Sequence, residues 1–146
     1  MRITLDSNIL VRAVASPLGP ALKLLNIILG AHTLVLSRFI LDEVERVLLY
    51  PRIQARYKIS ATEAAQFTGN LAEVAKLVEP EIIRPLVLSD PDDDPVLYTA
   101  ADGKVDVLCT RNLRHFGESD AREFCLLHGV RVMTDLELLR ELNQRN

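Results

Sequence analysis

Short apolar runs alternate with stretches of helical periodicity along the chain, and this alternation constrains the fold more than any other feature. Strands are predicted at Ile3–Leu5, Thr33–Leu36, Val105–Cys109 and Val130–Met133. A fifth strand is predicted at Ile82–Leu88, although Pro85 within it disfavours pairing there. Strands that alternate with helices are typical of an α/β fold with a mainly parallel sheet. Ligands of such sheets bind beyond the carboxyl ends of the strands, so the residues that follow each strand are the candidates for chemistry.

Helices are predicted between these runs, and several carry recognisable end signals. Ser60 with Glu63, and Thr134 with Glu137, have the spacing of a capping box. Gly129 is placed to close the helix before it. The predicted helices cover residues 8–14, 21–29, 38–49, 60–77, 96–101, 119–128 and a segment after 134. In the helix over 38–49, the expected shared apolar face is Phe39, Val44, Val47 and Leu48.

The composition is that of an ordinary globular protein. The chain has 146 residues, of which 49% are hydrophobic and 25% are charged, and we expect a single domain over residues 1–146. The most apolar stretch, Ala21–Leu36, is interrupted by polar residues, so no membrane span is predicted. Asp6 interrupts the apolar start, which argues against a secretory signal. Since Cys109 and Cys125 cannot form a disulfide framework, a soluble, reduced, cytoplasmic protein is expected.

The charge is unevenly distributed along the chain. The formal net charge is −3, yet residues 1–60 hold 8 Lys and Arg against 4 Asp and Glu, while residues 61–146 hold 9 against 16. Such an asymmetry permits one positive face on an acidic protein.

Acidic residues follow the predicted strands. Asp6 ends the first strand, Glu43 lies one to two turns into the helix after the second, and Asp92–Asp94 open another helix. Asn112 follows the strand over Val105–Cys109. If these side chains converge at one sheet edge, their carboxylates repel one another unless a cation neutralises them. Mg²⁺ and Mn²⁺ prefer oxygen ligands, and they support phosphodiester hydrolysis.

Each of these residues also has a structural interpretation. Asp6 can cap the next helix through its side chain. Asp92–Asp94 can form an Asx turn and a cap, with Pro95 in the first helical turn. Glu43 can lie on a solvated helix face.

Four segments resemble the motifs of PIN-domain proteins, a small metal-dependent nuclease fold found in the toxin components of many prokaryotic toxin–antitoxin pairs. The segments are Ile3–Leu10, Ser37–Val44, Asp90–Leu97 with Ala100, and Ala101–Asn112, and they occur in the order of the family. The resemblance implies a three-layer α/β/α fold with a central, mainly parallel sheet of four to five strands.

The resemblance also assigns residues to roles. Asp6, Glu43 and Asp93 match the three principal acidic positions, with Asp94 as the close alternative to Asp93. Asn8 matches a polar residue that supports the first Asp, and Thr110 matches a hydroxyl near the site.

Asn112 departs from the family pattern, because many relatives carry Asp at this position. A neutral amide ligand removes one negative charge, which weakens binding of a second ion in particular.

The implied activity is Mg²⁺- or Mn²⁺-dependent hydrolysis of RNA, with Asp6 and Asp93 as the most direct metal ligands. Glu43 would bind a metal water or orient the attacking water, and Asn112 would bind the ion or the substrate. The resemblance further implies a small antitoxin partner. A homodimer is expected, with the apolar helices over residues 21–29 and 61–77 as candidate interfaces.

A basic stretch with interleaved aromatic residues is a candidate RNA-binding surface. Tyr50 and Tyr57 can stack on unpaired bases, and the neighbouring cations can meet phosphates. The cations are Arg46, Arg52, Arg56 and Lys58. The alternative is a solvated helix face, with the tyrosines packed on the core.

Four other interpretations remain at this point. A haloacid-dehalogenase-like phosphatase needs a second Asp where Asn8 stands, and a response-regulator receiver domain needs paired acids after the first strand and a Lys after the last. A PIN-like protein that binds RNA or a partner, with catalysis weakened by Asn112, is a non-enzyme alternative. A zinc site at Cys125 and His128 is disfavoured, because the helical spacing of Cys125 suits the core.

Overall fold

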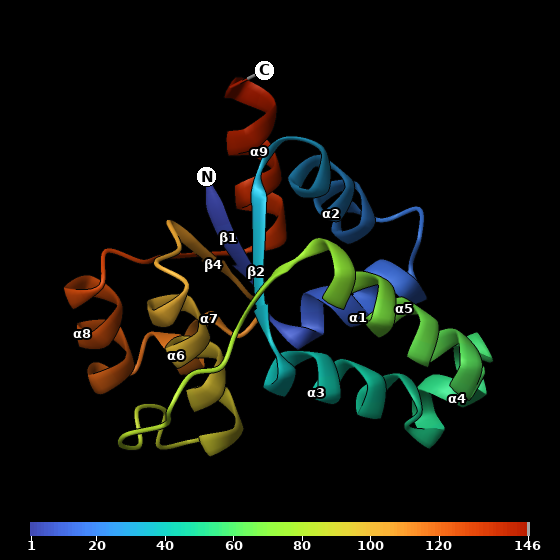
Figure 1. The fold of residues 1–146 in the computed structure, drawn as a ribbon, viewed down its shortest axis with the longest axis horizontal. Coiled ribbons are helices and arrows are strands. Elements are labelled where there is room, and N and C mark those ends of the chain that lie inside the picture. Colours follow the sequence, from blue (N-terminus) through green and yellow to red (C-terminus); the bar gives the residue numbers. More distant parts are fainter. Residues whose placement is uncertain (146) are drawn as a thin grey trace.

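Five parallel strands form one sheet in the order β3-β2-β1-β4-β5 (Figure 1). This computed structural model describes residues 1–145. The strands are β1 (Arg2–Leu5), β2 (Thr33–Ser37), β3 (Lys76–Val78), β4 (Val107–Cys109) and β5 (Arg131–Met133). Every neighbouring pair is parallel, so all carboxyl ends lie at the same edge of the sheet. The predicted α/β fold with a parallel sheet is confirmed.

Helices cover both faces of the sheet and complete the three-layer arrangement. α6 packs on β1, β2 and β4, and α8 packs on β5. In Figure 1, α6 and α8 lie on one side of the strands, and α1 and α2 lie on the other. The helices are α1 (Ser7–Ala15), α2 (Pro20–Ala31), α3 (Arg38–Leu48), α4 (Pro51–Tyr57), α5 (Ala61–Val74), α6 (Asp94–Asp102), α7 (Leu113–Phe116), α8 (Ser119–Leu127) and α9 (Asp135–Arg145), with a 3-10 turn at Pro91–Asp93.

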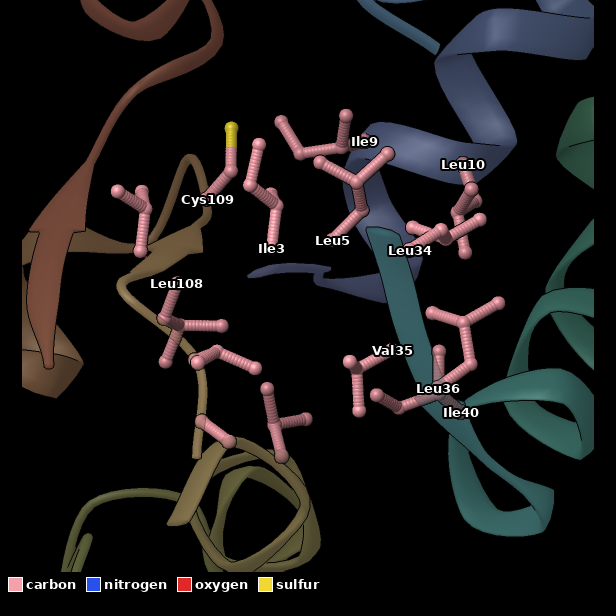
Figure 2. Packing of buried hydrophobic residues seen from close by; sticks show 14 of the residues in the cluster. Ile3, Leu5, Ile9, Leu10, Leu34, Val35, Leu36, Ile40, Leu108 and Cys109 are labelled. Atoms are coloured by element: carbon pink, nitrogen blue, oxygen red, sulfur yellow. The ribbon is translucent and has the colours of Figure 1, made fainter. Parts of the chain in front are cut away.

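The central strands are buried on both faces, which explains why they appear in the sequence as continuous apolar runs. Ile3 and Leu5 of β1 have no exposed surface, and Leu36 of β2 is equally buried. Figure 2 shows these side chains packed with residues of the adjoining helices, including Ile9 of α1. This close-packed core holds the carboxyl ends of β1, β2 and β4 in place, and the candidate site residues follow these ends.

Local sequence signals explain several helix ends. The capping box predicted at the start of α5 is present, because the Ser60 hydroxyl accepts from the Glu63 N–H and the Glu63 carboxylate accepts from the Ser60 N–H. Gly129 follows α8 with φ of 67°, a left-handed conformation that favours glycine. Gly103 ends α6 against β2, and a β-carbon there would lie 2.3 Å from Cγ1 of Val35.

Two sequence-based predictions about local structure were wrong. The helix that follows Ser60 ends at Val74 rather than Leu77, because Lys76–Val78 pairs with β2 as the strand β3. The segment Ile82–Leu88 is not a strand. Its backbone instead donates to a side chain, since the N–H groups of Leu86 and Val87 bind Oδ1 of Asp94 at 3.0 and 2.8 Å.

The buried face of α3 also differs from the expected one. Phe39 is 49% exposed, whereas Val44 and Leu48 are buried as predicted and Val47 is only partly buried. Ile40 and Leu41 occupy the buried positions of the first turn. Glu43, on the same helix, is only half-buried.

Two further observations concern the cysteines and the apolar helices. Cys109 and Cys125 are both free and buried. Within residues 1–145, no single helix is long and apolar enough to cross a membrane, and α1 and α2 reach that length only together, across a bend of 109°.

Candidate active site

A polar cleft of about 440 Å³ opens where β1 and β4 end, at the edge of the sheet that the sequence indicates. Its lining comes from α1, α3, α4, the 3-10 turn and the segment after β4. The polar lining residues are Asp6, Ser7, Asn8, Arg12, Glu43, Arg52, Asp90, Asp93, Arg111 and Asn112.

Asp6 lies directly after β1 and serves as the N-cap of α1. Its Oδ1 accepts from the N–H of Ser7 at 2.7 Å, which satisfies a free donor at the helix start. Its Oδ2 accepts from the hydroxyl of Thr110 at 2.8 Å and from the side-chain amide of Asn8 at 3.3 Å. The carboxylate is only 2% exposed, and all of these partners are neutral. Asp6 therefore caps the helix and also lines the cleft.

Ser7 connects two of the carboxylates. Its hydroxyl donates to Oε2 of Glu43 at 2.8 Å and lies 3.5 Å from Oδ1 of Asp6. Glu43 is half-buried on α3, so the first turn of α1 and the second turn of α3 meet through this side chain. The hydrogen bond fixes one oxygen of Glu43 and leaves Oε1 without a hydrogen bond from residues 1–145.

Asp93 ends the 3-10 turn and is buried. Its Oδ2 lies 2.8 Å from Nδ1 of His115, which belongs to α7. Ligand atoms of Asp90, Asp93 and His115 all lie within 4.8 Å of one another, an arrangement that could hold a metal ion. Asp6 and Glu43 line the same cleft but do not belong to this group of three.

Asp93 has different surroundings from its two acidic neighbours in the sequence, Asp92 and Asp94. Asp94 is buried and binds the backbone of Leu86 and Val87, so it stabilises a connecting segment and does not line the cleft. Asp92 is exposed, and its N–H donates to Asp90 as part of the turn. Only Asp93 of the three therefore lines the cleft.

The buried carboxylates favour their protonated forms. Burial raises the pKa of Asp6 to about 7, with a further increase from the charge of Asp93, although the Thr110 hydroxyl opposes the shift. Burial likewise raises the pKa of Asp93 to about 6, and the hydrogen bond from His115 opposes it. Two acids with raised pKa values in one cleft indicate a site that gains stability when a cation binds.

The side chains of Thr110 and Asn8 both donate hydrogen bonds to the carboxylate of Asp6. Thr110 is fully buried, donates to Asp6 and accepts from the N–H of Asn112 at 3.0 Å. The side-chain oxygen of Asn8 accepts from the N–H of Arg111 at 3.3 Å. Asn112 lines the cleft. These bonds tie the end of β1 to the segment after β4.

The donor set fits a hard divalent cation. Asp6, Glu43 and Asp93 supply carboxylate oxygens, and Asn112 supplies an amide oxygen in the same cleft. Oxygen ligands with several carboxylates suit Mg²⁺ or Mn²⁺, and an imidazole such as His115 is better tolerated by Mn²⁺. Burial raises the pKa of Asp6 and of Asp93, and a bound cation would favour the charged forms of both carboxylates.

Of the four cations predicted to bind RNA, two lie at or beside the cleft and two do not. Arg52 lines the cleft, and Arg46 lines an adjoining hollow beside Glu43. Arg56 lies over the ring of Tyr57 at 5.4 Å, and Lys58 ends α4 with φ of 52°. Neither of these two lines the cleft.

Of the two tyrosines in that stretch, Tyr57 packs partly against the core, and Tyr50 is exposed. The structural interpretation therefore holds for Tyr57, while Tyr50 remains available at the surface.

Four polar lining residues were not assigned to the site by the sequence interpretation, namely Ser7, Arg12, Asp90 and Arg111, and neither was His115, which contacts Asp93. Spacing could have indicated two of them. Arg12 lies four residues after Asn8 and so shares its face of α1. His115 lies three residues after Asn112, one turn along the short helix that Asn112 begins.

A sequence model of the PIN domain matches residues 2–114. The chain belongs to the PIN-domain family. The matched region contains β1 to β4 and all the acidic residues of the cleft, whereas His115, α8, β5 and α9 lie beyond it. PIN domains are generally nucleases that act on RNA and typically use divalent metal ions. The family match decides against the phosphatase and receiver-domain interpretations.

No similar protein was found among curated proteins.

Proposed function

We propose that residues 1–146 act as a single PIN domain that hydrolyses phosphodiester bonds of RNA, with Mg²⁺ or Mn²⁺ bound in the cleft. The observation that carries the proposal is the sharing of one cleft by Asp6, Glu43 and Asp93, which come from three separate parts of the chain. Asp6 is buried with neutral partners alone, a costly arrangement for a protein that does not bind a cation.

The proposed roles follow from the hydrogen bonds of each side chain. Asp6 and Asp93 would hold the ion most directly, and Asn112 would contribute its amide oxygen to the ion or to the substrate. When bound, the divalent ion would neutralise the developing charge and lower the pKa of water. Glu43 would orient the attacking water through Oε1 and accept its proton, because Ser7 occupies the other oxygen.

Two neutral side chains, one backbone N–H group and His115 would position this machinery. Thr110 and Asn8 hold the Asp6 carboxylate from one side, and the N–H of Ser7 holds it from the other. His115 fixes one oxygen of Asp93. Such contacts orient ligands and tune their affinity for the ion.

The biological role that we propose is the toxin component of a toxin–antitoxin pair, with a small antitoxin protein as partner. The four motifs that resemble those of such toxins support this role. We also propose a homodimer, supported by the exposed apolar side chains Leu29 on α2 and Val74 on α5. Sedimentation of the purified chain tests the dimer. Induced expression beside the Asp6→Ala variant tests the toxin role, and growth arrest by the wild type alone would support it.

The decisive experiment is cleavage of labelled single-stranded RNA by the purified chain in Mg²⁺, in Mn²⁺ and in EDTA. Asp6→Ala is the test variant, and Asp102→Ala, at an exposed position that ends α6, is the matched control. We expect cleavage that requires metal, is lost in Asp6→Ala and is retained in Asp102→Ala. Several unrelated RNA sequences are needed, because the chain carries no recognisable sequence for one target.

A folded wild type that binds these RNAs but cleaves none of them in either metal would refute the proposal. It would favour the alternative of a PIN-like binding protein, with Asn112 in place of a fourth acid. In that case Asp6→Ala would leave RNA binding unchanged.

A further inference from the structure

The acidic cleft also contains three arginines, each from a different part of the chain. Arg12 belongs to α1, Arg52 belongs to α4, and Arg111 follows β4. Arg111 pairs with the buried Asp135 of α9 at 3.7 Å. Arg12 and Arg52 form no ion pair with any residue of 1–145, so their charges are available to a ligand in the cleft.

Arg12 has an unsatisfied donor. The side chain is half-buried, and its Nε is buried without a hydrogen-bond partner in the described chain. Buried donors are rarely left without an acceptor in proteins, so an unpaired one calls for a specific explanation. A guanidinium presents its donors in a planar fork that suits the oxygens of a phosphate. An acceptor from a bound ligand would satisfy this group.

The two arginines line the same cleft as the carboxylates of Asp6, Glu43 and Asp93. When ionised, Asp6 and Asp93 carry the same sign of charge as a nucleic acid, so they repel its phosphates. A cleft that accepts an RNA strand therefore needs cations beside the acids, and Arg12 and Arg52 are the cations with no other partner.

We propose that Arg12 and Arg52 bind a backbone phosphate of the RNA strand next to the bond that is hydrolysed, and so hold the strand across the carboxylates. This inference rests on the proposed function, because it takes the carboxylates as the reaction centre. A contact with phosphate carries no base information, so its contribution is the same for every sequence. The inference also narrows the predicted RNA surface, since Arg56 and Lys58 lie outside the cleft.

The test is binding of fluorescein-labelled ten-nucleotide oligo-U and oligo-A RNA, measured by fluorescence anisotropy in EDTA between 50 and 200 mM salt. The variants are Arg12→Gln and Arg52→Gln. Arg140→Gln is the matched control, because this residue is exposed on α9 and does not line the cleft. We expect each test variant to lose roughly 5- to 10-fold in affinity for both RNAs, and the salt slope of log K to fall by about 0.7. Arg52→Lys should retain most of the affinity.

Wild-type affinity and salt slope in both glutamine variants would overturn the inference, and so would a wild type that does not bind RNA. Thermal unfolding checks that Arg12→Gln is folded, and if it is not, the exposed Arg52 decides alone. A wild type that cleaves RNA while the arginine variants bind normally overturns this inference only. A wild type that binds through these arginines but never cleaves overturns the proposed function only.

Discussion

Replacing Asp6 by Asn should stabilise the metal-free protein at pH 8 while it abolishes metal-dependent cleavage. The reason is the raised pKa of this buried carboxyl, which is about 7 in the folded chain against an ordinary value of 3.8. Between these values the unfolded chain releases the proton while the folded chain retains it. The free energy of unfolding therefore falls as the pH rises from about 4 to 7, and it stays low above that range.

The size of the effect follows from the two pKa values. A shift of about three units corresponds to about 4 kcal/mol at pH 8, an upper limit for a single group. Asn removes this cost and keeps the helix cap, since Asn and Asp are similarly good N-cap residues. Asn has one oxygen fewer, so the contact with Thr110 or Asn8 is weakened, which costs about 1–3 kcal/mol. The net gain expected is about 1–3 kcal/mol.

Urea unfolding followed by far-UV circular dichroism in EDTA measures this gain at pH 8 and at pH 4.5. At the lower pH the gain should shrink by about 3 kcal/mol, because wild-type Asp6 is then protonated in the folded chain. Asp102→Asn serves as the control and should change stability by no more than about 0.5 kcal/mol at either pH. Equal or lower stability of Asp6→Asn at pH 8, or a gain independent of pH, would refute the reasoning.

Three further changes test other parts of the site and fold. Glu43→Gln should preserve the melting temperature yet lower the cleavage rate at least about 100-fold, as measured by single-turnover cleavage of labelled RNA, and near-normal rates would contradict its role as base. His115→Ala should weaken Mn²⁺ binding about 10- to 100-fold by calorimetry, since it removes the contact that orients Asp93; unchanged affinity would show that the contact is only structural. Gly103→Ala should lower the free energy of unfolding by about 1–3 kcal/mol in urea, because the new methyl group meets Val35, and an unaffected midpoint would contradict the contact.

The elements that sequence analysis predicted well are those with strong local signals. The apolar runs of β1, β2 and β4 and the cap of α5 each depend on neighbouring residues, and all were placed within a few residues. β3 was missed because it has three residues, follows α5 closely and is defined by pairing with β2. The segment before Asp94 was also misjudged, because its backbone bonds go to a carboxylate that lies further along the chain.

The candidate site could be predicted only in part for a related reason. The resemblance to the family motifs assigned Asp6, Glu43 and Asp93 to the site, and the structure places all three in one cleft. The contacts of His115 and the exposure of Arg12 to the cleft depend on how α7 and α1 pack, and no short sequence pattern encodes that packing. Asp93 and Asp94 are adjacent in the sequence, but Asp93 lines the cleft, whereas Asp94 binds the backbone of Leu86 and Val87. Only the three-dimensional structure distinguishes the two.

The hydrogen bond between Thr110 and Asp6 joins residues that are 104 positions apart. β1 is the first strand to leave the ribosome, yet one of its two neighbours in the sheet, β4, is made only after residue 106. A nascent chain therefore holds an incomplete sheet and an unformed cleft until β4 has been made. Pairings this distant in sequence also slow folding, because the entropy of closing a long loop is lost before the contacts form. The order of translation thus delays assembly of the cleft until the segment that follows β4 exists.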